Sequence, residues 1–115
     1  MRSHTLYIAD LVAALEKIEE FTADITYDEF LRDDRTQSAV IRKFEIIGET
    51  AKNVPLPVRQ EYPVIPWREM AGMRDKLIYA YFGVDTLLVW RTVVNRVPDL
   101  RRTLCRILER ERGRY

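Results

Sequence analysis

The chain has 115 residues, of which 47% are hydrophobic and 32% charged, and its formal net charge is +1. This length suits one domain with one core, which we expect to cover residues 1–115. No apolar run approaches the roughly 20 residues of a membrane span, no secretory segment is visible, and the one cysteine, Cys105, excludes an internal disulfide. We therefore expect a cytoplasmic protein that does not contact a membrane.

The charge is distributed unevenly along the chain. From Arg91 to Tyr115 there are eight arginines and three acidic residues, a net of +5, whereas the first ninety residues carry a net of −4. An arginine-rich terminal helix can steer a polyanion. A solvated helix face explains the same pattern more simply, and we favour that interpretation.

The first half of the chain predicts two long helices joined by a short one. Apolar residues recur over residues 4–23 at the i, i+3, i+4, i+7 spacing of an amphipathic helix. Thr26 and Glu29 have the capping-box spacing, which predicts a short turn of helix. Asp33 or Asp34 is the expected N-cap of the second long helix. The apolar face of that helix comprises Val40, Phe44, Ile47, Gly48, Ala51 and Val54.

A proline-rich connector separates this part from a third helix. Pro55 ends the second helix, because the residue before a proline avoids helical geometry. Residues 55–66 are the connector, with room for one short turn after Pro57. Trp67 begins the third long helix and Gly83 ends it. Its predicted buried stripe comprises Met70, Met73, Leu77 and Ala80.

The last helix is predicted to start at Asp85, which can cap it, and to contain a break. Pro98 lies inside its apolar pattern, so a kink or short break is expected between Arg96 and Pro98. Four main helices with short connections predict an all-α, up-down bundle.

The stretch from Arg74 to Asp85 is the strongest candidate for function, since charged, aromatic and apolar residues interleave there. Arg74 and Tyr81 are seven residues apart and share a helix face. Arg74 and Tyr79 are separated by about 140° around the axis. They meet only if the arginine reaches around the helix or a second chain supplies one of them.

An arginine beside a proton-transfer residue is a minimal site for RNA cleavage. Arginine binds phosphate through a bidentate fork. In such a reaction the 2′-hydroxyl is deprotonated, the leaving 5′-oxygen is protonated, and the arginine stabilises the charge of the phosphorane.

The segment from Arg74 to Asp85 (RDKLIYAYFGVD) resembles the signature of HEPN-domain proteins of the HepT-like ribonuclease toxin group. The similarity extends over roughly residues 4–110. It includes Phe30 and the segments 36–42 (TQSAVIR), 46–52 (IIGETAK), 62–67 (YPVIPW) and 89–90 (VW).

This resemblance implies a HEPN-like homodimer whose two motif helices face one another across an active cleft. It also implies a metal-independent endoribonuclease without a cofactor, the toxin of a type VII toxin–antitoxin system. Its antitoxin is implied to be a minimal nucleotidyltransferase. The family motif is an arginine, four residues, a histidine, one residue and a tyrosine. Arg74 matches the arginine, and Tyr81 matches the tyrosine to which the antitoxin adds AMP.

The chain departs from the family at the histidine position, which holds Tyr79. Imidazole both takes and gives a proton near neutral pH, whereas a phenol, with a pKa of about 10, stays protonated at that pH. Three interpretations remain open: an engineered or selected variant, a natural member with degenerate chemistry, or a tyrosine with its own role. The alternative function is a non-catalytic dimeric module that binds the nucleotidyltransferase or RNA.

Three further residues are candidates for supporting roles. Asp75 would repel RNA phosphate unless it is paired, for example with Arg74. Lys76 either contacts phosphate or is solvated. Glu49 either faces the cleft and orients Arg74 or is simply exposed. The only histidine, His4, is expected to be solvent-exposed, and no set of metal ligands is apparent in the sequence.

Overall fold

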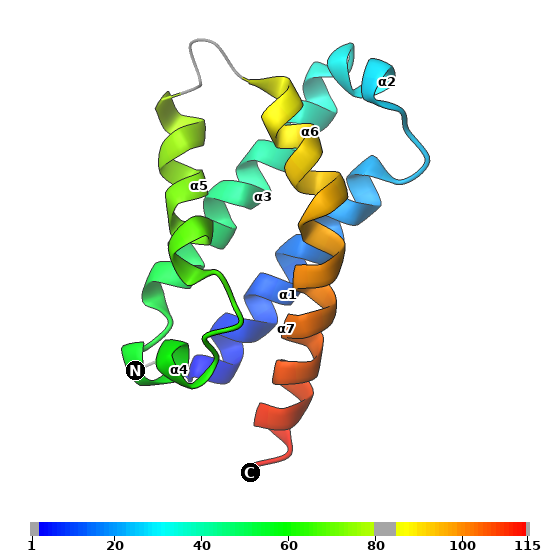
Figure 1. The fold of residues 1–115 in the computed structure, drawn as a ribbon. Coiled ribbons are helices and arrows are strands. Elements are labelled where there is room, and N and C mark those ends of the chain that lie inside the picture. Colours follow the sequence, from blue (N-terminus) through cyan, green and yellow to red (C-terminus); the bar gives the residue numbers. More distant parts are fainter. Residues whose placement is uncertain (1–2, 80–84, 115) are drawn as a thin grey trace.

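The computed structural model describes residues 3–79 and 85–114, without the side chains at positions 74 and 77–79. This part of the chain is built from helices that pack as a bundle (Figure 1). They are α1 (His4–Thr22), α2 (Tyr27–Leu31), α3 (Asp34–Asn53), α4 (Leu56–Glu61), α5 (Trp67–Tyr79), α6 (Thr86–Asn95) and α7 (Val97–Arg112). The predicted all-α architecture is confirmed.

The helix starts follow the capping residues of the sequence. Thr26 and Glu29 form both hydrogen bonds of a capping box at the start of α2. Asp33, and not Asp34, caps α3. Asp33 and Asp85 each accept a hydrogen bond, at 3.0 Å, from the amide three residues further on. Such caps satisfy amide groups that a helix start otherwise leaves without partners.

Prolines determine the breaks between helices. Val54 is the C-cap of α3, directly before Pro55, and α4 begins at Leu56, slightly earlier than expected. The predicted break in the last helix lies at Arg96, between α6 and α7. Pro98 occupies the first turn of α7, where its missing N–H removes no helical hydrogen bond.

The core lies where α1 packs against α3 and α7, and α3 carries α5 on its other side. All the predicted apolar positions of α3 are buried. On α5, Met70 is buried and Met73 partly buried, whereas the Leu77 side chain and Ala80 lie outside the described residues, as does the predicted helix end at Gly83. None of the described helices has the length and hydropathy needed to cross a membrane.

Candidate active site

Residues 74–79 of the motif lie on α5, which runs along α3 (Figure 1). The backbone places Arg74 and Tyr79 in the second half of this helix, as predicted. At the start of α5 the indole Nε1 of Trp67 donates to the carbonyl of Tyr62 at 3.0 Å, which fixes the first residue of the helix. The side chains of Arg74 and Tyr79, and all of Tyr81, lie outside the described residues.

Asp75 is paired across the gap between α3 and α5. Its Oδ1 lies 3.9 Å from the Nζ of Lys52, and both side chains are about half exposed, at 57% and 43%. An exposed pair of this kind adds little to stability, about 0–1 kcal/mol. Its consequence is electrostatic, because a cation from α3 reaches the motif helix one residue after Arg74.

The two other supporting candidates, Lys76 and Glu49, are both exposed. Lys76 lies at the rim of a hollow of about 410 Å³ between α5 and the α6–α7 pair. The floor of this hollow is apolar and includes Phe44, Met70 and Val97. The predicted role of Glu49 in orienting Arg74 stays a prediction, because the side chain of Arg74 lies outside the described residues.

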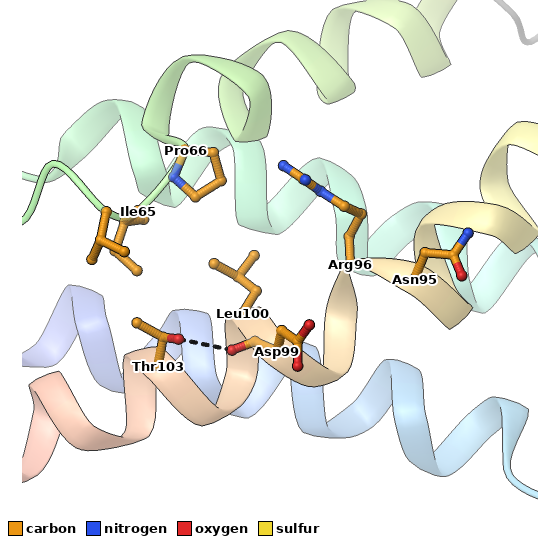
Figure 2. Close-up of a pocket in the computed structure, with 8 residues that line it drawn as sticks. Ile65, Pro66, Asn95, Arg96, Asp99, Leu100 and Thr103 are labelled. Carbon is orange, nitrogen blue, oxygen red and sulfur yellow. Dashed lines mark hydrogen bonds between the residues drawn. The ribbon is translucent and has the colours of Figure 1, made fainter.

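A smaller hollow of about 210 Å³ lies between the connector before α5 and the start of α7 (Figure 2). Its charged residues are already paired. Arg96 forms an ion pair with Glu69 of α5, and Asp99 forms one with Arg102. Figure 2 also shows Thr103 donating its hydroxyl to the carbonyl of Asp99, at 3.0 Å. This hollow therefore offers little to a charged ligand.

The most prominent polar cluster was not predicted from the sequence. Glu111 of α7 is completely buried. Its carboxylate accepts a hydrogen bond of 2.5 Å from the hydroxyl of Tyr62, and it lies 3.2 Å from Nε2 of His4 and 3.5 Å from Arg114. His4 was expected to be solvent-exposed, but its side chain is only 23% exposed because it packs against this carboxylate.

The cluster shifts the acidities of its members. Burial raises the pKa of Glu111, but hydrogen bonds from Tyr62 and His4 and the charge of Arg114 more than offset this, so the pKa lies below its ordinary value. Burial, followed by the hydrogen bond to Glu111, raises the pKa of Tyr62. Arg110 lies over the Tyr62 ring at 5.5 Å.

One sequence signal could have revealed this cluster. Glu111 continues the buried stripe of α7 at helical spacing after Leu104, Ile107 and Leu108. A carboxylate on an apolar stripe needs hydrogen-bond partners. The sequence does not say which partners these are, because His4 is 107 positions and Tyr62 is 49 positions away.

Comparison with known proteins identifies the family. Residues 11–107 match the model of the family described as HepT-like, ribonuclease HepT-like. The chain belongs to the HepT-like ribonuclease family. It is 55% identical to a protein of Thermococcus cleftensis named probable ribonuclease HepT. The alignment spans 100 residues, which is 87% of this chain and 91% of that protein.

Further relatives are similar to this chain over nearly their whole length. A putative RNase of Methanocaldococcus jannaschii is 42% identical over 103 residues, 90% of this chain and 89% of that protein. A putative RNase of Caldanaerobacter subterraneus is 36% identical over 112 residues, 97% of this chain and 100% of that protein. No solved structure matches the chain significantly.

In the HepT-like chain, the part of α5 that carries the motif is accompanied by cations. Lys52 and Lys76 are exposed beside it, and Arg68 is exposed near its start. Such groups suit a phosphate-bearing substrate. Within the described residues, no three His, Cys, Asp or Glu side chains are grouped to hold a metal ion.

Proposed function

We propose that this HepT-like chain is a HEPN-type endoribonuclease, the toxin of a type VII toxin–antitoxin system, that cuts RNA without a metal ion or cofactor. The ribonuclease family supports RNA as the substrate. The observation that carries the proposal is that one helix, α5, contains both Arg74 and Tyr79 and has Lys52 beside it.

In the proposed reaction the guanidinium of Arg74 binds the scissile phosphate. The 2′-hydroxyl of the preceding nucleotide gives its proton to water, and its oxygen attacks phosphorus. The bond from phosphorus to the 5′-oxygen breaks, and that oxygen takes up a proton. The products are a 2′,3′-cyclic phosphate and a 5′-hydroxyl, and Arg74 stabilises the charge that develops on the phosphorane oxygens.

Tyr79 occupies the acid–base position in this proposal and makes the enzyme weak. A phenol with a pKa of about 10 can donate to the leaving oxygen, but it is a poor base at neutral pH. Loss of a positioned acid–base group costs about 10²- to 10⁴-fold in rate. We therefore expect weak or undetectable cleavage by the chain as it stands.

The proposal requires a homodimer with the active cleft at its interface. Positions 74 and 79 are about 140° apart around α5, so one copy supplies the arginine and the other the acid–base residue most directly. Sedimentation should therefore give a mass of twice the 13.7 kDa of the chain. A monomer at all concentrations would contradict this arrangement.

Tyr81 is the proposed site of regulation. A nucleotidyltransferase antitoxin transfers AMP from ATP to the phenol oxygen and releases pyrophosphate, which adds bulk and negative charge beside the cleft. Incubation with that enzyme and labelled ATP should label the chain but not a Tyr81→Phe variant. Tyr27→Phe, on α2, is the matched control and should keep the label.

The second candidate is a non-catalytic dimeric module that binds the nucleotidyltransferase or RNA. The observation that favours it is the tyrosine at the histidine position of the motif. A neighbouring gene for a nucleotidyltransferase would fit both functions, so only a measurement of RNA cleavage separates them.

The deciding experiment is cleavage of a labelled RNA by the chain, by Tyr79→His, and by Tyr79→His combined with Arg74→Ala. We expect Tyr79→His to cut, the arginine-less protein to fail, and the original chain to be much weaker. Arg106→Ala in the Tyr79→His background is the control for loss of one exposed arginine. If neither residue at position 79 gives cleavage, the non-catalytic module is the correct function.

A further inference from the structure

A basic hollow of about 750 Å³ lies between the end of α3, α4 and the start of α5. Among the described residues that line it are three cations, Lys52, Arg59 and Arg68, and one carboxylate, Glu69. Glu69 is already engaged, since it forms the ion pair with Arg96. Lys52 pairs with Asp75 outside the hollow, so the excess of positive charge in the lining comes from Arg59 and Arg68.

Arg59 is held in place within this hollow. Its Nε donates to the carbonyl of Val54, the C-cap of α3, at 3.0 Å, and the side chain is partly buried. Within the described residues its two terminal amino groups make no hydrogen bond or ion pair. A fixed guanidinium loses less conformational freedom when it binds phosphate, which favours binding.

The hollow continues towards the motif along one side of α5. Trp67 and Ala71 line it, and position 74 follows them at the i, i+4, i+7 spacing of a helix face. The distance along the axis from Trp67 to Arg74 is about 10 Å at 1.5 Å per residue. Lys52 belongs to both regions, because it lines the hollow and also pairs with Asp75.

The arginine-rich helix α7 is a weaker candidate for the same role, despite its larger number of cations. Most of its arginines are neutralised by nearby carboxylates. The pairs formed by α7 are Arg101 with Glu19, Arg102 with Asp99 and Arg110 with Glu61, and Arg114, which follows α7, also pairs with Glu61. Within the described residues, Arg68 of the hollow has no such ion pair.

We propose that this hollow binds the sugar–phosphate backbone of the RNA next to the scissile phosphate. Lys52, Arg59 and Arg68 contact phosphate oxygens, and the partly buried Trp67 forms an apolar wall. Contacts of this kind position a nucleic acid without reading its sequence. The inference rests on the proposed function, because it assigns the surface that holds the substrate of that reaction.

The test measures binding separately from cleavage. The probe is a fluorescent single-stranded RNA of about 20 nucleotides whose 2′-O-methyl riboses lack the attacking hydroxyl. The test variant is Lys52→Gln with Arg68→Gln, two exposed residues whose replacement spares the core. The matched control is Arg102→Gln with Arg106→Gln on α7, which removes the same charge.

We expect the hollow variant to bind about tenfold more weakly at low salt. The slope of log affinity against log salt should fall by about 1.4, at ~0.7 per lost phosphate contact on a single strand. The α7 control should change affinity less than twofold. Arg59→Gln, a second variant, should also weaken binding while the thermal midpoint shows that the chain is folded.

Equal losses in the hollow and α7 variants would overturn the inference, since net charge alone would then explain binding. Unchanged RNA binding with lost binding to the nucleotidyltransferase would also overturn it, and would assign the hollow to a protein partner.

In the Tyr79→His background the hollow variant should raise KM and leave kcat nearly unchanged. If Tyr79→His cuts RNA and the hollow variants behave like the control, only this inference fails. If no form binds or cuts RNA, the proposed function itself fails.

Discussion

The two ends of α5 border regions that use polar groups in different ways. Near its start, α4, the beginning of α1 and the end of α7 meet around the buried carboxylate of Glu111 (Figure 1). On α5 itself, the described side chains are linked to neighbouring helices by exposed ion pairs, Arg96–Glu69 in the first turn and Lys52–Asp75 further along. A hollow of about 410 Å³ separates α5 from α6 and α7.

The two regions differ in how much their polar contacts are expected to stabilise the fold. A hydrogen bond to a buried charge is worth about 1.5–3 kcal/mol, whereas an exposed ion pair is worth about 0–1 kcal/mol. Polar stabilisation is therefore concentrated around Glu111, which is linked to the start of α5 through Tyr62. On the second half of α5, the described side chains of Asp75 and Lys76 are exposed.

The largest test of this comparison is Glu111→Ala. It leaves the Tyr62 hydroxyl buried without its acceptor and removes the partner of His4. We expect a loss of about 3 kcal/mol in the free energy of unfolding, measured by urea denaturation. Glu109→Ala, at an exposed position on the same helix, is the control and should change stability by less than about 0.5 kcal/mol. Equal effects would mean that the cluster does not stabilise the fold.

The pH dependence of stability provides a second test. The pKa of Glu111 is lower in the folded chain than its ordinary value of 4.5. Its ionisation therefore stabilises the fold above that value, and this contribution is lost as the pH falls through the folded pKa. Thermal midpoints between about pH 7 and 3 should drop less steeply in Glu111→Gln than in the original chain. The pKa of Asp33 is also lowered, by its hydrogen bonds to Thr36. Asp33 changes the pH dependence of stability equally in both proteins, so its effect cancels when they are compared.

The sequence predicted those parts of the fold that depend on local chemistry. The caps at Thr26, Asp33 and Asp85 and the break near Pro98 each depend on residues within a few positions, so a linear pattern contains them. The apolar face of α3 followed from helical spacing for the same reason.

The Glu111 cluster could not be predicted in this way, because its members come from three distant segments. Its partners are set by how α1, α4 and α7 pack, and His4 was therefore misjudged as exposed. The candidate site could be predicted from the sequence only in part. Its helix and the spacing of Arg74 and Tyr79 were predictable, but the pairing of Asp75 with Lys52 depends on the packing of α5 against α3.

Tyr62→Phe tests the cluster with a smaller change. The ring and its contact with Arg110 at 5.5 Å are retained, and only the hydroxyl bound to Glu111 is lost. We expect a loss of about 1.5 kcal/mol by urea denaturation, half that of Glu111→Ala. Tyr27→Phe, whose ring packs against Trp90, is the matched control and should be nearly neutral. If Tyr62→Phe lost as much free energy of unfolding as Glu111→Ala, the hydrogen bond from Tyr62 would account for the whole stabilisation by Glu111.

The smallest expected effect, and the only one of opposite sign, is that of Gly72→Ala in the middle of α5. A methyl group there meets no described atom within 4 Å, and alanine favours a helix over glycine by about 1 kcal/mol. At dilutions where the chain is monomeric, Gly72→Ala should raise the free energy of unfolding by about 0.5–1 kcal/mol. Ala71→Gly, one position away, should lower it by a similar amount.

The same variant tests which face of α5 meets a second copy. If the two motif helices pack together as proposed, the added methyl group enters the interface and weakens the dimer, which sedimentation at several concentrations measures. Stabilisation of the monomer together with weakened association is the expected result. Stabilisation with unchanged association would mean that the face of α5 around Gly72, which borders the hollow between α5 and the α6–α7 pair, does not meet a second copy. The arginine and the acid–base residue would then have to meet through another interface.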